Sequence, residues 1–122
     1  MTETEKIAFA SIVTSMMCAD FEITFDENCY FNELKYKLSL TDEIIDKARN
    51  TSKQSAIDIL KGSSSYIKNE TIFILCKMAT FGDGLTKEKN IMIRDTCIAW
   101  GIPLESIFDL SKISYLMSLK ID

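Results

Sequence analysis

Residues 19–34 read ADFEITFDENCYFNEL, and they join a polar, acidic turn to an amphipathic segment. Thr24 precedes Glu27 by three positions, which is the spacing of a capping box. In this motif the threonine hydroxyl and the glutamate carboxylate each accept a backbone N–H that the first helical turn leaves without a partner. A helix is therefore predicted to begin after Thr24. Its apolar residues recur with the period of one helix face: Tyr30, Phe31, Leu34 and Leu38.

The same helical periodicity continues on both sides of this turn. Upstream, one helix is predicted to bury Phe9, Ile12, Val13, Met16 and Met17. Downstream, helices are predicted to begin at Thr41, at a Thr51–Gln54 capping box, near Tyr66, at Thr86 and at Pro103, with stops at Gly62, Gly82–Gly84 and Gly101. The last of these helices would bury Leu104, Ile107, Phe108 and Tyr115. No stretch alternates long enough to predict a strand, so we expect an all-α fold: a single compact bundle of about seven helices, with residues 1–122 as one domain.

The acidic turn occurs twice. Thr24 and Thr86 lie 62 positions apart, and each follows an apolar residue and precedes an acidic one by two positions. The same shift aligns Ile12 with Ile74, Met16 with Met78, Asn28 with Asn90, and Leu40 with Ile102. We interpret the chain as two pseudo-symmetric helix–acidic turn–helix units joined by two shorter helices. Residues 9–17 should then pack antiparallel to residues 30–38, and residues 71–78 should pack in the same way against residues 91–100.

These turns resemble those of TerB-like proteins, the tellurite-resistance family. Ala19–Glu27 is similar to the family's Ala-Asp-Gly-x-hydrophobic-Ser/Thr-x-x-Glu turn, and Phe81–Glu88 is similar to its second copy. The helix exits at Leu38–Leu40 and Trp100–Pro103 also match, and the resemblance covers roughly residues 7–110. It implies a bundle of about seven helices, acidic turns proposed to bind metal ions, and association with membrane-bound tellurite-resistance partners or other stress-response modules. The sequence departs from the family where Phe21 replaces a glycine and where Gly82 stands opposite Asp20.

The acidic residues of the two turns are the candidate metal ligands. Hard cations such as Ca²⁺ take several carboxylate oxygens, which residues on one tight turn can supply. The alternative is helix capping alone, because acidic side chains in a first helical turn face the positive end of the helix dipole. A divalent cation is the one cofactor that the sequence suggests. The candidates are Asp20, Glu22, Asp26 and Glu27 in the first turn, and Asp83 and Glu88 in the second.

Composition narrows the classes of function. The chain has no His, which excludes His-based general bases and Ser-His-Asp or Cys-His nucleophile systems, so we do not expect an enzyme. A net charge of −4 argues against nucleic-acid binding and against docking to an anionic membrane. The methionines sit in helical core patterns, and all four cysteines have apolar neighbours in the sequence, which predicts buried free thiols. The N-terminus lacks the features of a signal peptide, and no run is long enough to span a membrane, so we expect a cytoplasmic protein.

From these features we expect a non-catalytic, TerB-like interaction module that acts through protein partners, including membrane-associated ones. The alternative is a sensor that binds Ca²⁺ or a similar ion at its acidic turns. Titration with metal ions separates the two.

Overall fold

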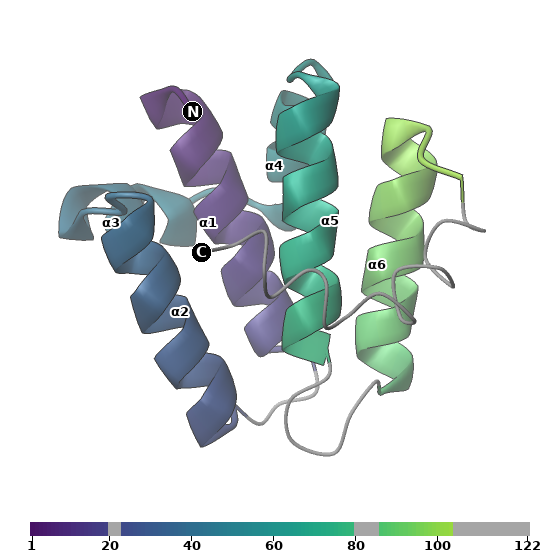
Figure 1. The fold of residues 1–122 in the computed structure, drawn as a ribbon. Helices are drawn as coiled ribbons and strands as arrows, with labels where there is room; N and C mark the ends of the chain where they lie inside the picture. The colour runs from purple at the N-terminus through teal and green to yellow at the C-terminus, as the bar shows by residue number, and fades with distance from the viewer. Residues whose placement is uncertain (20–22, 80–85, 104–122) are drawn as a thin grey trace.

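The chain folds into α-helices. A computed structural model describes residues 1–19, 23–79 and 86–103, and within these ranges it contains no β-strand. The helices are α1 (Glu3–Met17), α2 (Phe25–Lys37), α3 (Asp42–Arg49), α4 (Lys53–Lys61), α5 (Ser65–Ala79) and α6 (Lys87–Trp100), as drawn in Figure 1. The predicted all-α class is confirmed. The predicted helix after Pro103 lies outside the described residues.

Side-chain caps set most helix starts. Thr24, Thr41 and Thr86 are N-caps, as the sequence predicts. The predicted start of α4 is wrong by one residue, because Ser52 rather than Thr51 accepts the N–H of the third helical residue. Thr51 instead donates its hydroxyl to the Lys47 carbonyl, 2.9 Å away, and so extends the end of α3. A capping box at Thr2 that we did not predict opens α1.

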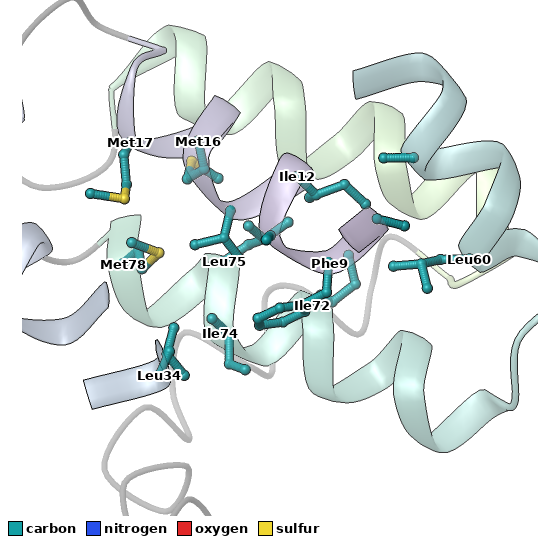
Figure 2. Close-up of a cluster of buried hydrophobic side chains, with 14 of the residues drawn as sticks. Phe9, Ile12, Met16, Met17, Leu34, Leu60, Ile72, Ile74, Leu75 and Met78 are labelled. Atoms are coloured by element: carbon teal, nitrogen blue, oxygen red, sulfur yellow. The ribbon is translucent and has the colours of Figure 1, made fainter. Parts of the chain in front are cut away.

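Helix α1 is the central helix of the bundle. Six of its apolar side chains are nearly or fully inaccessible on several faces: Ala8, Phe9, Ala10, Ile12, Val13 and Met16. A helix that is apolar around most of its circumference belongs in a core rather than at a surface. Its most extensive backbone contacts are with α4 and α3, and it also contacts α5. Figure 2 shows Phe9, Ile12 and Met16 of α1 among Ile72, Leu75 and Met78 of α5.

The helices of the two predicted units are not placed equivalently. The expected contact between α5 and α6 is present, and the Trp100 indole also donates to the Ile57 carbonyl of α4 at 2.9 Å. In contrast, α2 makes few close backbone contacts with any described helix, and α1 is not an intimate partner for it. The predicted superposition of an α1–α2 pair on an α5–α6 pair is therefore not confirmed. Helix α2 is attached through buried side chains, namely Tyr30, Phe31 and Leu34.

The individual helices α2 and α6 begin and end with the same local structure. Both begin after a threonine N-cap, at Thr24 and Thr86. Both end on a residue in the left-handed region, Ser39 with φ 54° and Gly101 with φ 71°. The two exits make the same hydrogen bond five residues back, Leu40 N–H to the Lys35 carbonyl and Ile102 N–H to the Cys97 carbonyl, each 2.9 Å. These pairs all differ by 62 positions.

The end of α1, the start of α2, the end of α5 and the start of α6 lie at one end of the molecule (Figure 1). The first turns of α2 and α6 are thus brought near each other in space although they are far apart in the sequence. None of the described helices combines the length and the apolarity that crossing a bilayer requires.

Candidate functional site

The first turns of α2 and α6 have the same capping geometry. The Glu27 N–H donates to Thr24 Oγ1 at 3.1 Å, and the Lys89 N–H donates to Thr86 Oγ1 at 3.3 Å. In α2 the box is reciprocal, since Glu27 Oε1 accepts from the Thr24 N–H at 3.3 Å. The predicted cap at Thr24 and the predicted partner at Glu27 are both confirmed. The side chain of the third residue of each of these two helices is buried.

These two third residues form a buried ion pair. Lys89 Nζ lies 3.5 Å from Glu27 Oε1, and the two side chains are 1% and 0% exposed. The carboxylate lies at the positive end of the α2 dipole, which favours it, whereas the ammonium lies at the positive end of the α6 dipole, which does not. Glu27 supplies the charge that makes a buried Lys89 tolerable, because an isolated ammonium in the interior would be strongly disfavoured.

Glu27 carries one oxygen that the capping box does not use. Glu27 Oε2 is buried and accepts no hydrogen bond from the part of the chain that the structure describes. Glu27 Oε1, in contrast, faces Lys89 Nζ and the backbone and hydroxyl of Thr24. Oε1 thus has several donors around it, whereas Oε2 can still accept a hydrogen bond.

The other predicted metal ligands are distributed differently. Asp26 is exposed on the first turn of α2. Glu88 is exposed on α6, where it lines a shallow groove with Lys53 and Cys18. Asp20, Glu22 and Asp83 lie outside the described residues. Within residues 1–19, 23–79 and 86–103, no three acidic or cysteine side chains come together as a metal site. The metal site therefore stays a prediction.

Lys89 is the residue of this site that sequence reasoning missed. The signal was available, because the 62-residue shift that pairs Thr24 with Thr86 also pairs Glu27 with Lys89. Two residues with the same local role and opposite charge are candidates for mutual contact when the two units face each other.

The cysteines depart from the prediction in their burial. All four are free thiols, but Cys18 and Cys29 are exposed, so the expectation that they are buried is wrong. Apolar neighbours in the sequence do not determine which face of a helix a residue occupies. Cys76 and Cys97 are shielded, and burial raises the pKa of Cys76 to about 12 and that of Cys97 to about 11. Neither is a ready nucleophile at neutral pH.

A hollow of about 430 Å³ lies between the first half of α5 and the end of α6. Its apolar walls are Ile72, Phe73 and Trp100, and its polar groups include Lys68 and Asn69. The described lining contains no carboxylate or thiol that could serve as a general base or nucleophile beside them.

The outer face of α2 exposes aromatic side chains. Phe25 is 82% exposed and Tyr36 is 89% exposed, and the exposed Cys29 lies between them on the same face. Helix α6 also exposes apolar side chains outward, since Ile91 and Ile98 are 47% and 63% exposed. Two exposed aromatic residues on one helix face are more informative than single exposed aliphatic ones, because aromatic side chains are enriched at protein interfaces.

Comparison with known proteins gives no match: no family model, no curated protein and no solved structure is similar to this chain. What the exposed faces and the buried pair do must be inferred from their own chemistry.

Proposed function

We propose that the chain is a non-catalytic helical interaction module of the TerB type, which acts through protein partners in a tellurite or stress response in the cytoplasm. Membrane-associated proteins are the class of partner that the family resemblance predicts. The observation that carries the proposal is the row of exposed side chains on α2, from Phe25 through Cys29 to Tyr36. Exposed aromatic side chains such as Phe25 and Tyr36 lose unfavourable contact with water when a partner covers them.

We also propose that α2 and α6, with the turns before them, descend from one duplicated unit. The matching threonine caps and the matching exits at Ser39 and Gly101 support this. In this proposal the buried pair of Glu27 and Lys89 joins the two units at their equivalent positions. The remaining surface, including the row on α2, is then free to bind a partner.

Capture of partners from the native host tests the proposal. The wild-type protein and the Phe25→Ser/Tyr36→Ser variant are immobilised, and retained proteins are quantified by mass spectrometry. The matched control is Tyr66→Ser, which removes a tyrosine on α5 that is 73% exposed. We expect a defined set of proteins to be retained by the wild type and the control but lost by the α2 variant. Equal retention by all three proteins contradicts the proposal.

A second candidate function is a divalent-cation sensor that uses the acidic turns. The observation that favours it is Glu27 Oε2, a buried carboxylate oxygen that accepts no hydrogen bond from the described residues. An oxygen of this kind is a suitable ligand for Ca²⁺. Lys89 opposes this function, because an ammonium 3.5 Å from the same carboxylate already neutralises its charge. Calcium titration tests this candidate, as described below.

A further inference from the structure

The exposed row on α2 continues along the whole length of the helix. Phe25, Cys29, Asn32 and Tyr36 follow one another at spacings of four, three and four residues, which places them on one face. All four are exposed. Figure 1 shows α2 at one side of the bundle. Tyr36 and Cys29 also line a shallow groove together with Glu33 and Lys37.

Charged side chains flank the row, with an acidic residue near one end and a basic residue near the other. Asp26 lies beside Phe25 in the first turn, and Lys37 lies beside Tyr36 in the last. Roughly three helical turns separate Asp26 from Lys37, as they separate Phe25 from Tyr36, so the two charges lie along the same edge of the row. The edge therefore has Asp26 at its N-terminal end and Lys37 at its C-terminal end, with Glu33 one turn before Lys37.

We propose that a second copy of this chain docks on this row, with the two α2 helices antiparallel about a two-fold axis near the middle of the helix. This inference rests on the proposed function and names the partner that the row binds. The axis brings Phe25 of one copy onto Tyr36 of the other, and it brings Asp26 of one copy near Lys37 of the other. Each contact occurs twice, as an isologous interface requires.

The charges select the antiparallel arrangement. A parallel pair about a two-fold axis would place the Asp26–Lys37 edges of the two copies on opposite sides of the contact, so these charges would not pair, and it would also align the two helix dipoles unfavourably. An antiparallel pair reverses both effects. Glu33 of each copy lies toward the axis, and this like-charge contact weakens the dimer.

The size of the row predicts a weak dimer. A helix of 13 residues is about 20 Å long, so a contact confined to one helix face buries less than a stable interface between two proteins does. Stable interfaces bury roughly 1,200–2,000 Å². We therefore expect reversible association that depends on protein concentration.

Sedimentation velocity from about 10 μM to about 1 mM measures this association. We expect the wild type to shift from monomer to dimer across the range. Tyr36→Glu should weaken the association at least about tenfold, because it replaces an aromatic contact with a charge. Tyr66→Glu is the matched control, since Tyr66 is 73% exposed on another helix against 89% for Tyr36, and it should associate like the wild type. Both positions are exposed, so neither variant is expected to unfold.

Charge exchange tests the orientation. Asp26→Lys and Lys37→Glu should each weaken the dimer, and the double variant should restore it, since an antiparallel pair then regains both contacts with reversed sign. Cys29 tests the face: in a Cys18→Ser background a short bismaleimide should link two chains through Cys29, whereas Cys29→Ser should abolish the product.

The outcomes are separable from those of the partner-capture experiment. A wild type that stays monomeric throughout overturns the homodimer even if Tyr36 is needed to capture another protein, in which case the interaction module stands. Equal weakening by Tyr36→Glu and Tyr66→Glu also overturns it. A double variant weaker than both single variants overturns the antiparallel orientation.

Discussion

The first turns of α2 and α6 are built alike locally and differ where they meet. Each has a threonine N-cap whose hydroxyl accepts the N–H of the third helical residue. That residue is Glu27 in one helix and Lys89 in the other, and the two side chains form a pair in the core. Hence the two helices share the hydrogen bonding of their first turns, while the side chains at the equivalent positions carry opposite charges.

This comparison shows that a capping residue can stabilise both its own helix and a contact between two helices. Glu27 completes its own helix start through Thr24 and also neutralises Lys89 of another helix. Lys89 has no comparable local benefit, because its ammonium lies at the unfavourable end of the α6 dipole. Its place in the interior is explained by the tertiary contact.

Removing Lys89 should produce the largest effect. Lys89→Met leaves the Glu27 carboxylate buried without its counter-charge, and we expect a loss of about 3–5 kcal/mol in the free energy of unfolding. Urea denaturation followed by circular dichroism measures it. The matched control is Lys87→Met, which removes an exposed lysine from the same turn and should change stability by less than about 0.5 kcal/mol.

A double-mutant cycle sharpens this prediction. Glu27→Gln keeps an acceptor for the capping box but removes the negative charge that lies 3.5 Å from Lys89 Nζ, and it should therefore also lower stability. The Glu27→Gln/Lys89→Met double variant should lose clearly less than the sum of the single losses, since neither buried charge remains. Additive losses would show that the 3.5 Å pair contributes little to the coupling of the two helices.

The reaction rates of Cys29 and Cys97 distinguish the exposed face of α2 from the buried face of α6. Cys29 is exposed, whereas burial raises the pKa of Cys97 from 9.0 to about 11. A thiol with its pKa raised by two units has about a hundredfold less thiolate near neutral pH. Alkylation of the native protein should therefore modify Cys29 and Cys18 rapidly, and Cys97 at least about a hundredfold more slowly.

Peptide mapping by mass spectrometry at successive times measures the four rates. After unfolding without a reductant, all four cysteines should be modified. Two cysteines that stay blocked after unfolding would contradict the finding of four free thiols.

The helix starts could be predicted because capping is a local property. The threonine N-caps at Thr24, Thr41 and Thr86 follow from residues within one turn of each other. The start of α4 was wrong because Thr51 and Ser52 can both cap, and the choice depends on a hydrogen bond from Thr51 to the preceding helix. The site could be predicted only in part. Glu27 was identified from its spacing, but the burial of Lys89 depends on how two distant helices meet.

The residues that end α2 and α6 provide another test of the same comparison, with a smaller expected change in stability. Ser39 and Gly101 both adopt positive φ, but only glycine does so without steric cost. Ser39→Gly should stabilise the protein by up to about 1 kcal/mol, and Gly101→Ser should destabilise it by about 1 kcal/mol. A Cβ added at position 101 would meet no atom of the described residues within 4 Å, so we expect the loss to come from the backbone conformation. Thermal unfolding measures both variants, and a stabilising Gly101→Ser variant would contradict the shared exit.

Calcium should produce the smallest effect, and its size separates capping from metal binding. If the acidic residues only cap helices, millimolar Ca²⁺ should leave the melting temperature almost unchanged. If they form a site, the stabilisation follows RT ln(1 + [L]/Kd), which is about 2.7 kcal/mol at a hundredfold excess over Kd. For a domain of this size that corresponds to a shift of several degrees.

We expect almost no shift in melting temperature, for two reasons. Lys89 already supplies a positive charge to Glu27, and Phe21 stands where a glycine would let the backbone turn sharply around an ion. Asp20→Ala and Thr24→Ala are the diagnostic variants. Thr24→Ala should lower stability by about 1 kcal/mol with or without Ca²⁺, because it removes the N-cap acceptor. A large calcium shift in the wild type that disappears in Asp20→Ala but persists in Thr24→Ala would make the cation sensor the better account of these turns, since only a bound ion couples Asp20 to stability in this way.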